Sequence, residues 1–310
     1  MQYGAVVVTF NRQQLLIESI TALMQQTVPP TKIIIIDNHS TDDTRDALQA
    51  NGILANPSVD YRYLEQNIGG AGGFARGMQI AQADPNLDWV SLSDDDAIFE
   101  PDYFEKLIAY QADHPTRQIL TGSVYVADGR LQADQRNRFT SWSTFRTQAV
   151  PASEYDGNFE FDQYTFCGVF MSLAIVKQVG VADAGFFIWW DDCEYAVRTA
   201  KLARPVNVSA AKLIHKTYLP SLDLKTKFIP DWRLYYGLRN RFITIKRWRA
   251  NPVVSLAWLS FFYARLLVKL CGPFYRGYRK MVLKAYVQSL RDAAVEKEGL
   301  NPNFMPGQKF

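Results

Sequence analysis

The sequence predicts an α/β fold in which a mostly parallel sheet is flanked by helices and is followed by a basic helical C-terminal extension. Strand-like and helix-like segments alternate through the first hundred residues, as in chains that build a parallel sheet between two helical layers. The first two strand-like runs, at residues 4–10 and 33–37, are almost continuously apolar and rich in β-branched residues, which is typical of strands buried on both faces. In addition, the first two thirds of the chain carry a net negative charge and the last third carries a net positive charge.

Four strands are expected at residues 4–10, 33–37, 61–67 and 89–96. The first is followed by an amphipathic helix that ends before Pro29, and the second by a polar turn that caps a helix starting near Thr41. Right-handed crossovers bring the carboxyl ends of all these strands to one edge, where such sheets bind ligands. The polar motif residues follow the strands directly: Asn11, Arg12, Asp37, Asn67 and Asp94–Asp96.

The charge distribution indicates two functions. Residues 1–195 hold 12 Lys and Arg against 26 Asp and Glu, a net charge of −14, whereas residues 196–310 hold 22 against 5, a net charge of +17. An acidic part suits a metal cation and a basic part an anionic surface, although a chance partition remains an alternative. We expect a catalytic domain over 1–225, with a donor half at 1–120 and an acceptor half at 121–225, and a basic amphipathic region over 226–310.

The basic region predicts peripheral attachment to the inner face of a membrane. The apolar stretch 253–264 is only 12 residues long before Arg265, which is too short to span a bilayer, and basic side chains after it reach toward lipid phosphates. Packing on the catalytic domain or an oligomer interface is the alternative. No nucleic-acid-binding signature accompanies these charges, so no nucleic-acid partner is expected. Three cysteines without paired spacing and the absence of a leader-like start predict a cytoplasmic protein.

The triplet Asp94–Asp96 indicates a metal site. Two carboxylates separated by one residue can both reach a hard divalent cation, and such a cation bridges diphosphate oxygens. A solvated acidic turn is the alternative, which the preceding buried strand disfavours.

The glycine-rich run at 67–77 has two functional interpretations. Gly70, Gly72 and Ala75 match the dinucleotide-binding fingerprint, but that fingerprint belongs after the first strand of a fold and this run follows the third. Alternatively, paired glycines let the backbone approach a phosphate or sugar closely. A plain flexible loop is the third possibility.

The segment at 186–198 places aromatic residues directly before acids. Trp189 and Trp190 offer flat faces for a sugar ring, and Asp191, Asp192 and Glu194 are candidates for a general base. A helix N-terminus with buried tryptophans is the alternative. His215 follows an apolar stretch, where a lone histidine is more often structural than a ligand.

Five ordered motifs, VVTFNR, IIIIDNHSTDDT, NIGGAGGFARG, SLSDDD and WWDDCEYAVR, followed by His215, together resemble the inverting family 2 glycosyltransferases of the GT-A fold. The resemblance covers about residues 3–220 and is closest to bacterial galactofuranosyltransferases that use UDP-galactofuranose. The chain is shorter than the large polymerising members, which favours the addition of one or a few sugars.

The resemblance implies roles residue by residue. The nucleotide would be bound by Thr9, Arg12, Asp37, Asn67 and Asp95. The metal, Mn²⁺ or Mg²⁺, would be bound by Asp94, Asp96 and His215. The catalytic base would be Asp192. The donor and acceptor sugars would be contacted by Gly70, Trp189, Trp190, Asp191, Glu194 and Arg239, the last through a lipid-linked pyrophosphate.

These features predict an enzyme that moves galactofuranose from a UDP-sugar donor to a lipid-linked glycan acceptor in bacterial polysaccharide synthesis, such as that of O-antigen in the cell envelope. A rhamnosyltransferase using dTDP-rhamnose is the alternative within the family. A non-catalytic nucleotide-sugar-binding protein and a nicotinamide dehydrogenase are alternatives of other classes, and an oligomer is possible.

Overall fold

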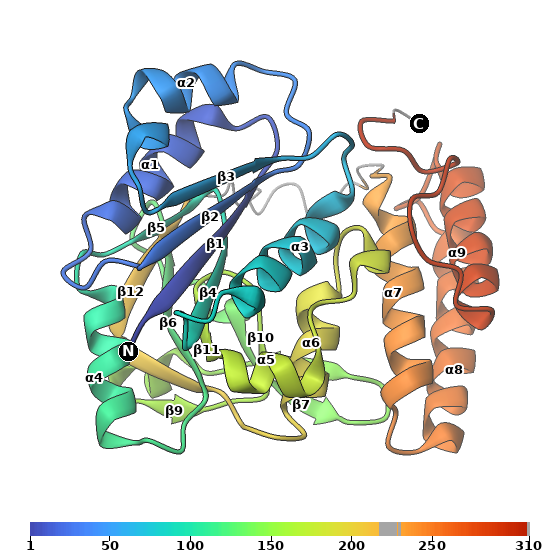
Figure 1. The fold of residues 1–310 in the computed structure, drawn as a ribbon. Coiled ribbons are helices and arrows are strands. Elements are labelled where there is room, and N and C mark those ends of the chain that lie inside the picture. The colour runs from blue at the N-terminus through green and yellow to red at the C-terminus, as the bar shows by residue number, and fades with distance from the viewer. Residues whose placement is uncertain (217–227, 229–230, 309–310) are drawn as a thin grey trace. The chain divides into compact units, whose positions relative to one another are not determined.

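The computed structural model describes residues 1–216, 228 and 231–308, and these residues divide into two compact units (Figure 1). The sheet unit comprises residues 1–138, 148–184 and 192–217, and the helical unit comprises residues 139–147, 185–191 and 218–310, each with the exception of the residues not described. The predicted domain boundary at 225 lies outside the described residues.

The helices and strands are β1 (Tyr3–Thr9), α1 (Gln13–Met24), β2 (Lys32–Asp37), α2 (Thr44–Ala50), η1 (Ile53–Ala55), β3 (Val59–Tyr63), α3 (Gly69–Ala83), β4 (Trp89–Asp94), β5 (Ala97–Phe99), α4 (Tyr103–Asp113), β6 (Ile119–Val126), η2 (Ala133–Gln135), β7 (Arg136–Ser141), β8 (Arg146–Ala149), η3 (Ala152–Asp156), β9 (Phe159–Glu160), β10 (Gln163–Tyr164), β11 (Val169–Ser172), α5 (Leu173–Val179), η4 (Ala184–Phe186), α6 (Asp191–Thr199), β12 (Val206–His215), α7 (Arg233–Trp248), α8 (Pro252–Cys271) and α9 (Arg279–Ala294).

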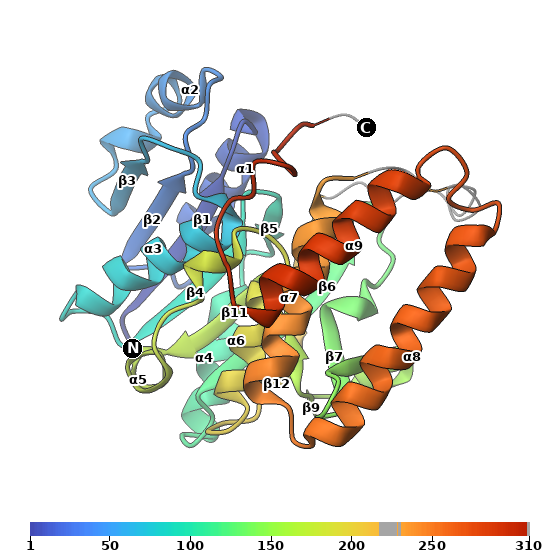
Figure 2. The same ribbon diagram turned by 90° about the vertical axis from the view of Figure 1, so that its right-hand side faces the viewer.

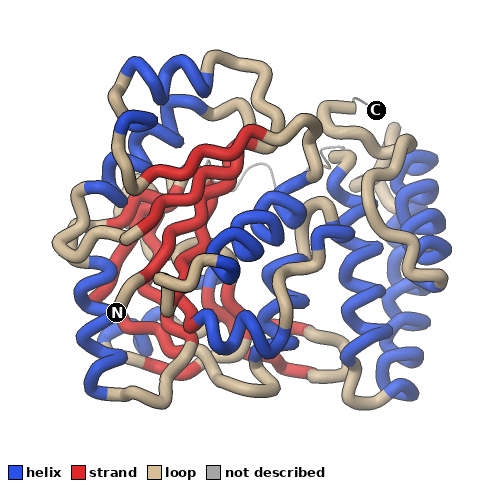
Figure 3. Tube along the Cα trace, viewed as in Figure 1, coloured by secondary structure: helices blue, strands red, loops and turns tan. Residues whose placement is uncertain are grey.

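The main sheet of the described chain, whose strands are among those drawn in red in Figure 3, runs in the order β3-β2-β1-β4-β11-β6-β12-β5, with β9 paired to β12. Strands β3, β2, β1 and β4 are parallel, whereas β11 is antiparallel to both of its neighbours. The chain winds outward from β1 to β3 and then returns to the other side of β1 with β4. This reversal is a topological switch point, where open α/β sheets bind ligands beyond the strand ends.

The core lies on both faces of this sheet, as the continuous apolar runs predict. Val6 and Val8 of β1 face one layer with α3, α5 and α6, while Ala5 and Val7 face the other layer with α1, α2 and α4. All four side chains are buried. Burying each such valine contributes about 1.5–3 kcal/mol, so the central strand is strongly held.

The glycine-rich run is the interior of α3 and not a loop. A Cβ on Gly73 would lie 2.6 Å from Val8 Cγ1, and one on Gly77 would collide with Val6, so these glycines let α3 approach β1 closely. A Cβ on Gly70 would meet no atom within 4 Å. The flexible-loop interpretation is therefore wrong, and helix packing explains most of the run.

The described part of the helical unit contains three long helices, of which α7 and α9 pack together (Figure 2). Phe187, Trp232, Tyr235 and Tyr236 form its aromatic core together with Phe304, whose ring stacks on Tyr235 at 4.6 Å. Helix α7 carries five Lys and Arg residues, as the predicted basic helical C-terminal extension requires.

Helix α8 is longer than the apolar stretch from which it was predicted. It continues through Arg265 and Lys269 to Cys271, which makes it 20 residues long and, by length and composition, able to cross a membrane. The expectation that this segment is too short to span was therefore wrong, because the two basic residues do not end the helix. It ends at Cys271, directly before Gly272 and Pro273, where a proline disfavours continuation of the helix.

Candidate active site at the strand ends

Three of the predicted nucleotide-binding residues meet where β1 and β4 end. Thr9 donates its hydroxyl to Asp95 Oδ2 at 2.6 Å, and Arg12 Nη1 lies 3.3 Å from Asp95 Oδ1 and 2.8 Å from Asp96 Oδ2. Thr9, Asp95 and Asp96 are buried, whereas the Arg12 side chain is half exposed. Arg12 thus joins the first strand to the acidic triplet and still presents part of its guanidinium to solvent.

Burial and neighbouring charges shift the pKa values of this cluster in opposite directions. Burial raises the pKa of Asp95 to about 6, against the hydrogen bond from Thr9 and the charge of Arg12. Burial also acts to raise the pKa of Asp96, but His215 and Arg12 lower it by more, so it lies below its ordinary value. Asp96 is therefore ionised at neutral pH.

His215, the last residue of β12, lies against Asp96. Its Nε2 is 3.2 Å from Asp96 Oδ1, and its Nδ1 is 2.9 Å from Gln132 Oε1. Because an amide oxygen only accepts hydrogen bonds, the Nδ1 atom carries a proton and, in the neutral ring, Nε2 has its lone pair toward Asp96. Burial lowers the pKa of His215, but the Asp96 carboxylate raises it by more.

Asp96 and His215 fit a divalent cation in two respects. Asp96 Oδ1 is buried, and apart from the His215 Nε2 atom 3.2 Å away it has no hydrogen-bonding neighbour among the described residues. Two ligands at right angles, each about 2.1 Å from a metal, lie about 3.0 Å apart, which is close to the separation of Oδ1 and Nε2. Gln132 accepts the Nδ1 hydrogen bond and so fixes the ring, as the outer hydrogen-bond partners of metal-binding histidines do.

The predicted metal triad is not assembled as a group of three. Within the described ranges, no three or more His, Cys, Asp and Glu side chains are arranged to hold a metal. Asp94 ends β4 next to Val8 of β1 and is partly exposed. The structure thus brings Asp96 and His215 together and places Asp94 at the adjoining strand end.

The other two predicted nucleotide-binding residues lie beyond β2. Asp37 is buried and accepts hydrogen bonds from Ser40 N at 2.7 Å and from the Tyr61 hydroxyl at 2.6 Å. Asn67 Oδ1 accepts from Asn38 Nδ2 at 3.1 Å and from Gly69 N at 2.8 Å. These side chains therefore fix the turns that border the strand ends, and Asn67 fixes the start of α3.

Asp192, the predicted base, lies in the first turn of α6 in the sheet unit. Burial raises its pKa to about 6, against a hydrogen bond that its Oδ1 accepts from Cys193 N at 2.6 Å. A carboxylate with a pKa near neutrality is both ionised at pH 7 and basic enough to accept a proton from a reacting hydroxyl. Asp191, next to it, is buried.

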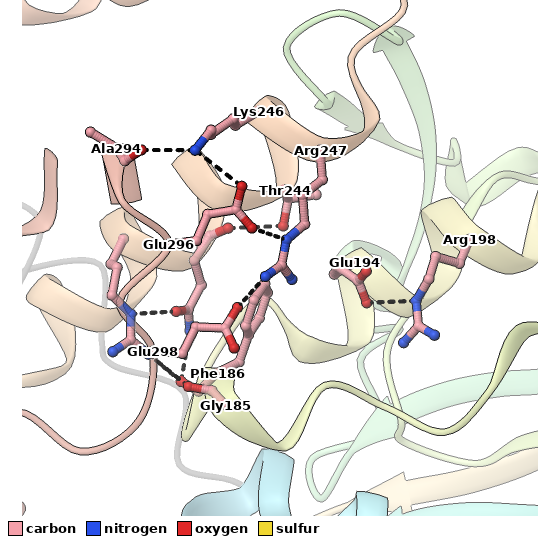
Figure 4. A network of polar contacts seen from close by, with 12 residues as sticks. Gly185, Phe186, Glu194, Arg198, Thr244, Lys246, Arg247, Ala294, Glu296 and Glu298 are labelled. Carbon is pink, nitrogen blue, oxygen red and sulfur yellow. Dashed lines mark hydrogen bonds and ion pairs between the residues drawn. The ribbon is translucent and has the colours of Figure 1, made fainter. Parts of the chain in front are cut away.

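Glu194 does not face an acceptor. It is 2% exposed, and its Oε2 lies 2.9 Å from Arg198 Nε, one turn further along α6 (Figure 4). Arg198 also donates to the carbonyls of Val179 and Val181. The assignment of Glu194 to the acceptor site is therefore wrong, because the carboxylate belongs to an internal ion pair that ties α6 to the end of α5.

Trp189 and Trp190 belong to the helical unit and differ in exposure. Trp189 is 47% exposed and its ring lies against Gly237, where a Cβ would approach Trp189 Cε3 to 2.9 Å. Trp190 is partly buried, and the Arg241 guanidinium lies 5.2 Å from its ring centroid. Trp189 therefore presents an aromatic face on which a sugar ring can stack.

Arg239 was predicted to contact a pyrophosphate, and the structure contradicts this. The side chain is 1% exposed and donates hydrogen bonds to the carbonyls of Gly185, Phe186 and Gly299. Its guanidinium is thus saturated by backbone oxygen atoms and is closed to an anionic ligand.

Sequence reasoning missed three residues that organise these groups: Asn38, Gln132 and Asn240. Asn38 directly follows Asp37, and Asn240 directly follows Arg239. Each is therefore the neighbour of a residue that the sequence predicts to be in the site. Gln132 lies 83 residues before His215 and no local pattern distinguishes it.

The chain matches the model of one protein family and is similar to several named proteins. The model of glycosyl transferase family 2 matches residues 5–176, which is more than half of the chain. Galactofuranosyltransferase GlfT1 of Mycolicibacterium smegmatis is 26% identical over 268 residues, which cover 83% of this chain and 87% of that protein.

Two solved structures share the fold. The structure of GalNAc-T7 with UDP, GalNAc and Mn²⁺ has a TM-score of 0.64 at 14% identity, and it covers 96% of this chain and 57% of its own. That of S. aureus TarS 1–349 in complex with UDP-GlcNAc has a TM-score of 0.60 at 16% identity, and it covers 94% of this chain and 80% of its own. The predicted GT-A fold and the family resemblance are thereby confirmed, and the dehydrogenase alternative is wrong.

Proposed function

Because the chain belongs to glycosyl transferase family 2, we propose that it is a metal-dependent, inverting transferase that moves galactofuranose from UDP-galactofuranose to a lipid-linked glycan. The contact between Asp96 and His215 carries the proposal, because a buried carboxylate oxygen and an imidazole nitrogen, both of them metal-binding atoms, lie 3.2 Å apart. Their separation suits two ligands of one cation. The likeness to galactofuranosyltransferases supports the choice of donor sugar.

Asp96 and His215 would hold Mn²⁺ or Mg²⁺, with Asp94 as the third protein ligand. When bound, the cation neutralises charge on the departing diphosphate. Arg12, which already reaches toward Asp96, adds a positive charge for the phosphate groups. Asp95 holds Thr9 and Arg12 in place through a hydrogen bond and an ion pair.

Asp192 removes the proton from the attacking hydroxyl of the acceptor. The hydroxyl oxygen forms a bond to the anomeric carbon while the bond from that carbon to the diphosphate breaks, and the electron pair leaves with the nucleotide. One displacement from the opposite face inverts the anomeric centre. The raised pKa of Asp192 supports this role, because a weakly acidic carboxyl group makes the better proton acceptor.

A donor-hydrolysis screen tests the proposal. Purified protein is incubated with UDP-galactofuranose, other UDP-sugars and dTDP-rhamnose, with excess EDTA and then with Mn²⁺, and nucleotide release is measured. We expect release from UDP-galactofuranose that stops in EDTA and returns with Mn²⁺. Asp96→Asn should weaken Mn²⁺ binding, whereas Asp113→Asn, at an exposed acid that ends α4, should behave as the wild type.

Other outcomes have definite meanings. Undiminished turnover in EDTA removes the metal from the proposal. Preference for dTDP-rhamnose makes the enzyme a rhamnosyltransferase. Donor binding without release or transfer, with every donor and acceptor tried, identifies a nucleotide-sugar-binding protein instead.

We further propose that the helical unit holds the enzyme on an anionic membrane, where a lipid-linked acceptor lies. Residues 232–291 contain 13 Lys and Arg and neither Asp nor Glu. The outer face of α8 is apolar and open to solvent, with Val253 75%, Leu256 67% and Phe261 64% exposed. Leu266 and Leu270 on its inner face are buried within the protein, which favours a helix lying in the interface over one that spans.

Six exposed cations accompany this face: Arg265, Lys269, Arg276, Arg279, Lys280 and Lys284. Each contributes about 1 kcal/mol near an anionic leaflet, so the set can decide between bound and free protein. Flotation with vesicles rich in phosphatidylserine tests this. We expect binding at low salt, release at high salt, and loss of binding in Leu256→Ser/Phe261→Ser. A matched pair of charge reversals on the sheet unit, Arg45→Glu/Arg76→Glu, should leave flotation unchanged. Indifference to lipid charge and salt would contradict the proposal.

A further inference from the structure

The segment that carries the two tryptophans has an unusual backbone. Phe187, Trp189 and Trp190 have φ values of 65°, 64° and 71°, in the left-handed region that large side chains rarely adopt. Such residues cost on the order of 1–3 kcal/mol each, and they persist only where the surrounding structure enforces them. Something in the helical unit must therefore hold this segment.

Asn240 of α7 supplies most of the contacts. Its Nδ2 lies within hydrogen-bond distance of three carbonyls of the segment, at 2.9 Å from Phe186 O, 3.0 Å from Ile188 O and 2.8 Å from Trp189 O. Asn240 is completely buried, so water cannot replace these bonds. Hydrogen bonds in such a dry environment are stronger than those at a surface, and an unpaired carbonyl there is costly.

Arg239 completes the arrangement and fixes the orientation of the Asn240 amide. Arg239 Nε donates to Asn240 Oδ1 at 2.9 Å, which identifies that atom as the oxygen and directs Nδ2 toward the carbonyls. Arg239 Nη2 also donates to Gly185 O at 3.1 Å and Phe186 O at 3.0 Å. The two adjacent side chains together bind every carbonyl from Gly185 to Trp189 except that of Phe187.

We call Arg239 and Asn240 together the clamp. The C-terminal segment holds the clamp in place. Arg239 Nη1 donates to Gly299 O at 2.6 Å, and Gly299 N donates to Gly185 O at 2.6 Å. Figure 4 shows Arg247 of α7 between Glu296 and Glu298, with contacts of 2.8 and 2.6 Å that fix the chain just before Gly299. The C-terminal segment and α7 therefore enclose residues 185–189 within the helical unit.

We propose that Arg239 and Asn240 are positioning residues for the acceptor, which hold residues 185–190 in the strained conformation that presents Trp189. The aromatic ring of Phe187 packs against Tyr236 in the core, whereas Trp189, two residues later, is 47% exposed. The strained φ angles turn the chain between these two directions. The inference rests on the proposed transferase function, because it assigns Trp189 to a sugar acceptor.

The test compares Asn240→Leu with Thr244→Val. Thr244 is one turn further along α7, is equally buried and donates one hydrogen bond to Asn240 O, so its loss weakens the same helix without releasing the clamp. We expect Asn240→Leu to lower kcat/KM for the acceptor by roughly 10–100-fold, since small displacements of substrate-positioning groups have effects of this size. The Kd for UDP with Mn²⁺ should stay within about twofold, because the proposed donor-binding residues belong to the sheet unit.

Hydrogen exchange supplies a readout that does not depend on activity. The amides of residues 185–190 should exchange at least about tenfold faster in Asn240→Leu, but not in Thr244→Val, because the released segment opens locally. Arg239→Lys, which keeps the charge but lacks the planar set of donors, should give the same pattern to a smaller extent. Gly237→Ala should displace the Trp189 ring and raise the acceptor KM while leaving exchange unchanged.

Two results would overturn the inference. Either equal acceptor kcat/KM in Asn240→Leu and Thr244→Val, or unchanged exchange of residues 185–190 in Asn240→Leu, shows that the pair is not a clamp for this segment. If the wild-type protein transfers no sugar with any donor, the proposed function and the acceptor role both fail. The exchange experiment then still decides whether the clamp exists.

Discussion

Replacing Asp192 with asparagine separates chemistry from binding. Asparagine has the same shape and can still accept the hydrogen bond from Cys193 N, but its amide cannot accept a proton from a reacting hydroxyl. We expect kcat to fall by roughly 10²–10⁴, which is the usual contribution of a positioned base. The Kd for UDP with Mn²⁺ should change little, because Asp192 has no place among the proposed nucleotide ligands.

The pKa of Asp192, about 6, predicts an acid limb in the rate. The base form is about half populated at pH 6, about nine-tenths at pH 7 and about one-tenth at pH 5, so kcat/KM, which reports the free enzyme, should fall about tenfold between the plateau and pH 5. With an ordinary aspartate pKa near 3.9, the rate at pH 5 would stay above about 90%. The size of this fall in rate therefore tests whether burial raises the pKa of the Asp192 carboxylate.

The same shift predicts that the substitution stabilises the protein. Because the pKa is higher in the folded state than in the unfolded state, the neutral carboxyl group favours folding, and this advantage is lost as the pH rises through about 6. A shift of about two units corresponds to on the order of 2–3 kcal/mol. Asp192→Asn should thus be more stable than the wild type above pH 7 and equal to it below about pH 4.

The assay measures kcat/KM for the acceptor against pH at two Mn²⁺ concentrations, together with urea unfolding at pH 4 and pH 8. Protonation of metal ligands would also produce an acid limb, but that limb shifts to lower pH as Mn²⁺ increases, whereas one set by Asp192 does not. Wild-type turnover in Asp192→Asn would refute the assignment of the base. A limb that moves with Mn²⁺, or an equal free energy of unfolding at pH 8, would refute the reasoning from its pKa.

Three further predictions concern the supporting structure. Gln132→Leu should weaken Mn²⁺ affinity by roughly 10–100-fold in calorimetric titrations, because the ring of His215 loses its outer partner, while kcat at saturating metal is largely retained. Gly73→Ala should destabilise the protein by about 1–3 kcal/mol, because the added methyl enters the contact between helix and sheet, whereas Gly70→Ala should have little effect in urea unfolding. Glu194→Gln should lower the Tm but keep most of the transfer rate, and a loss of activity as large as that of Asp192→Asn would show that Glu194 takes part in the chemistry.

The architecture of the sheet could be predicted because its signals are local. Apolar runs identify β1 and β2, the short segment that precedes the acidic triplet identifies β4, and the carboxyl ends of these strands must meet at one edge once the crossovers are right-handed. The third strand ends four residues earlier than expected, at Tyr63, because the polar residues after it belong to the turn into α3. The spacing of Gly69, Gly73 and Gly77 by four residues was the available sign that the glycine run is helical.

The use of each acid could not be predicted, because it depends on partners far along the chain. Nothing near Asp95 shows that Thr9, 86 residues earlier, donates to it, so three neighbouring acids look alike in the sequence. Glu194 pairs with Arg198 at a helical spacing of four, which the sequence does contain. Arg239 is closed to ligands by carbonyls from two distant segments, and those contacts exist only in the folded chain.

The cluster of Asp94, Asp95, Asp96 and Arg12 also determines how cation and donor affect each other. These four side chains have a formal charge of −2 when all are ionised. An anionic nucleoside diphosphate approaching this edge alone meets electrostatic repulsion, whereas a divalent cation brings the sum to zero. Binding of the two ligands should therefore be positively coupled, and thermodynamic reciprocity requires that the donor tighten the cation by the same factor by which the cation tightens the donor. We therefore expect the protein to bind the proposed metal weakly until the sugar nucleotide arrives, and to complete its site only when both are present.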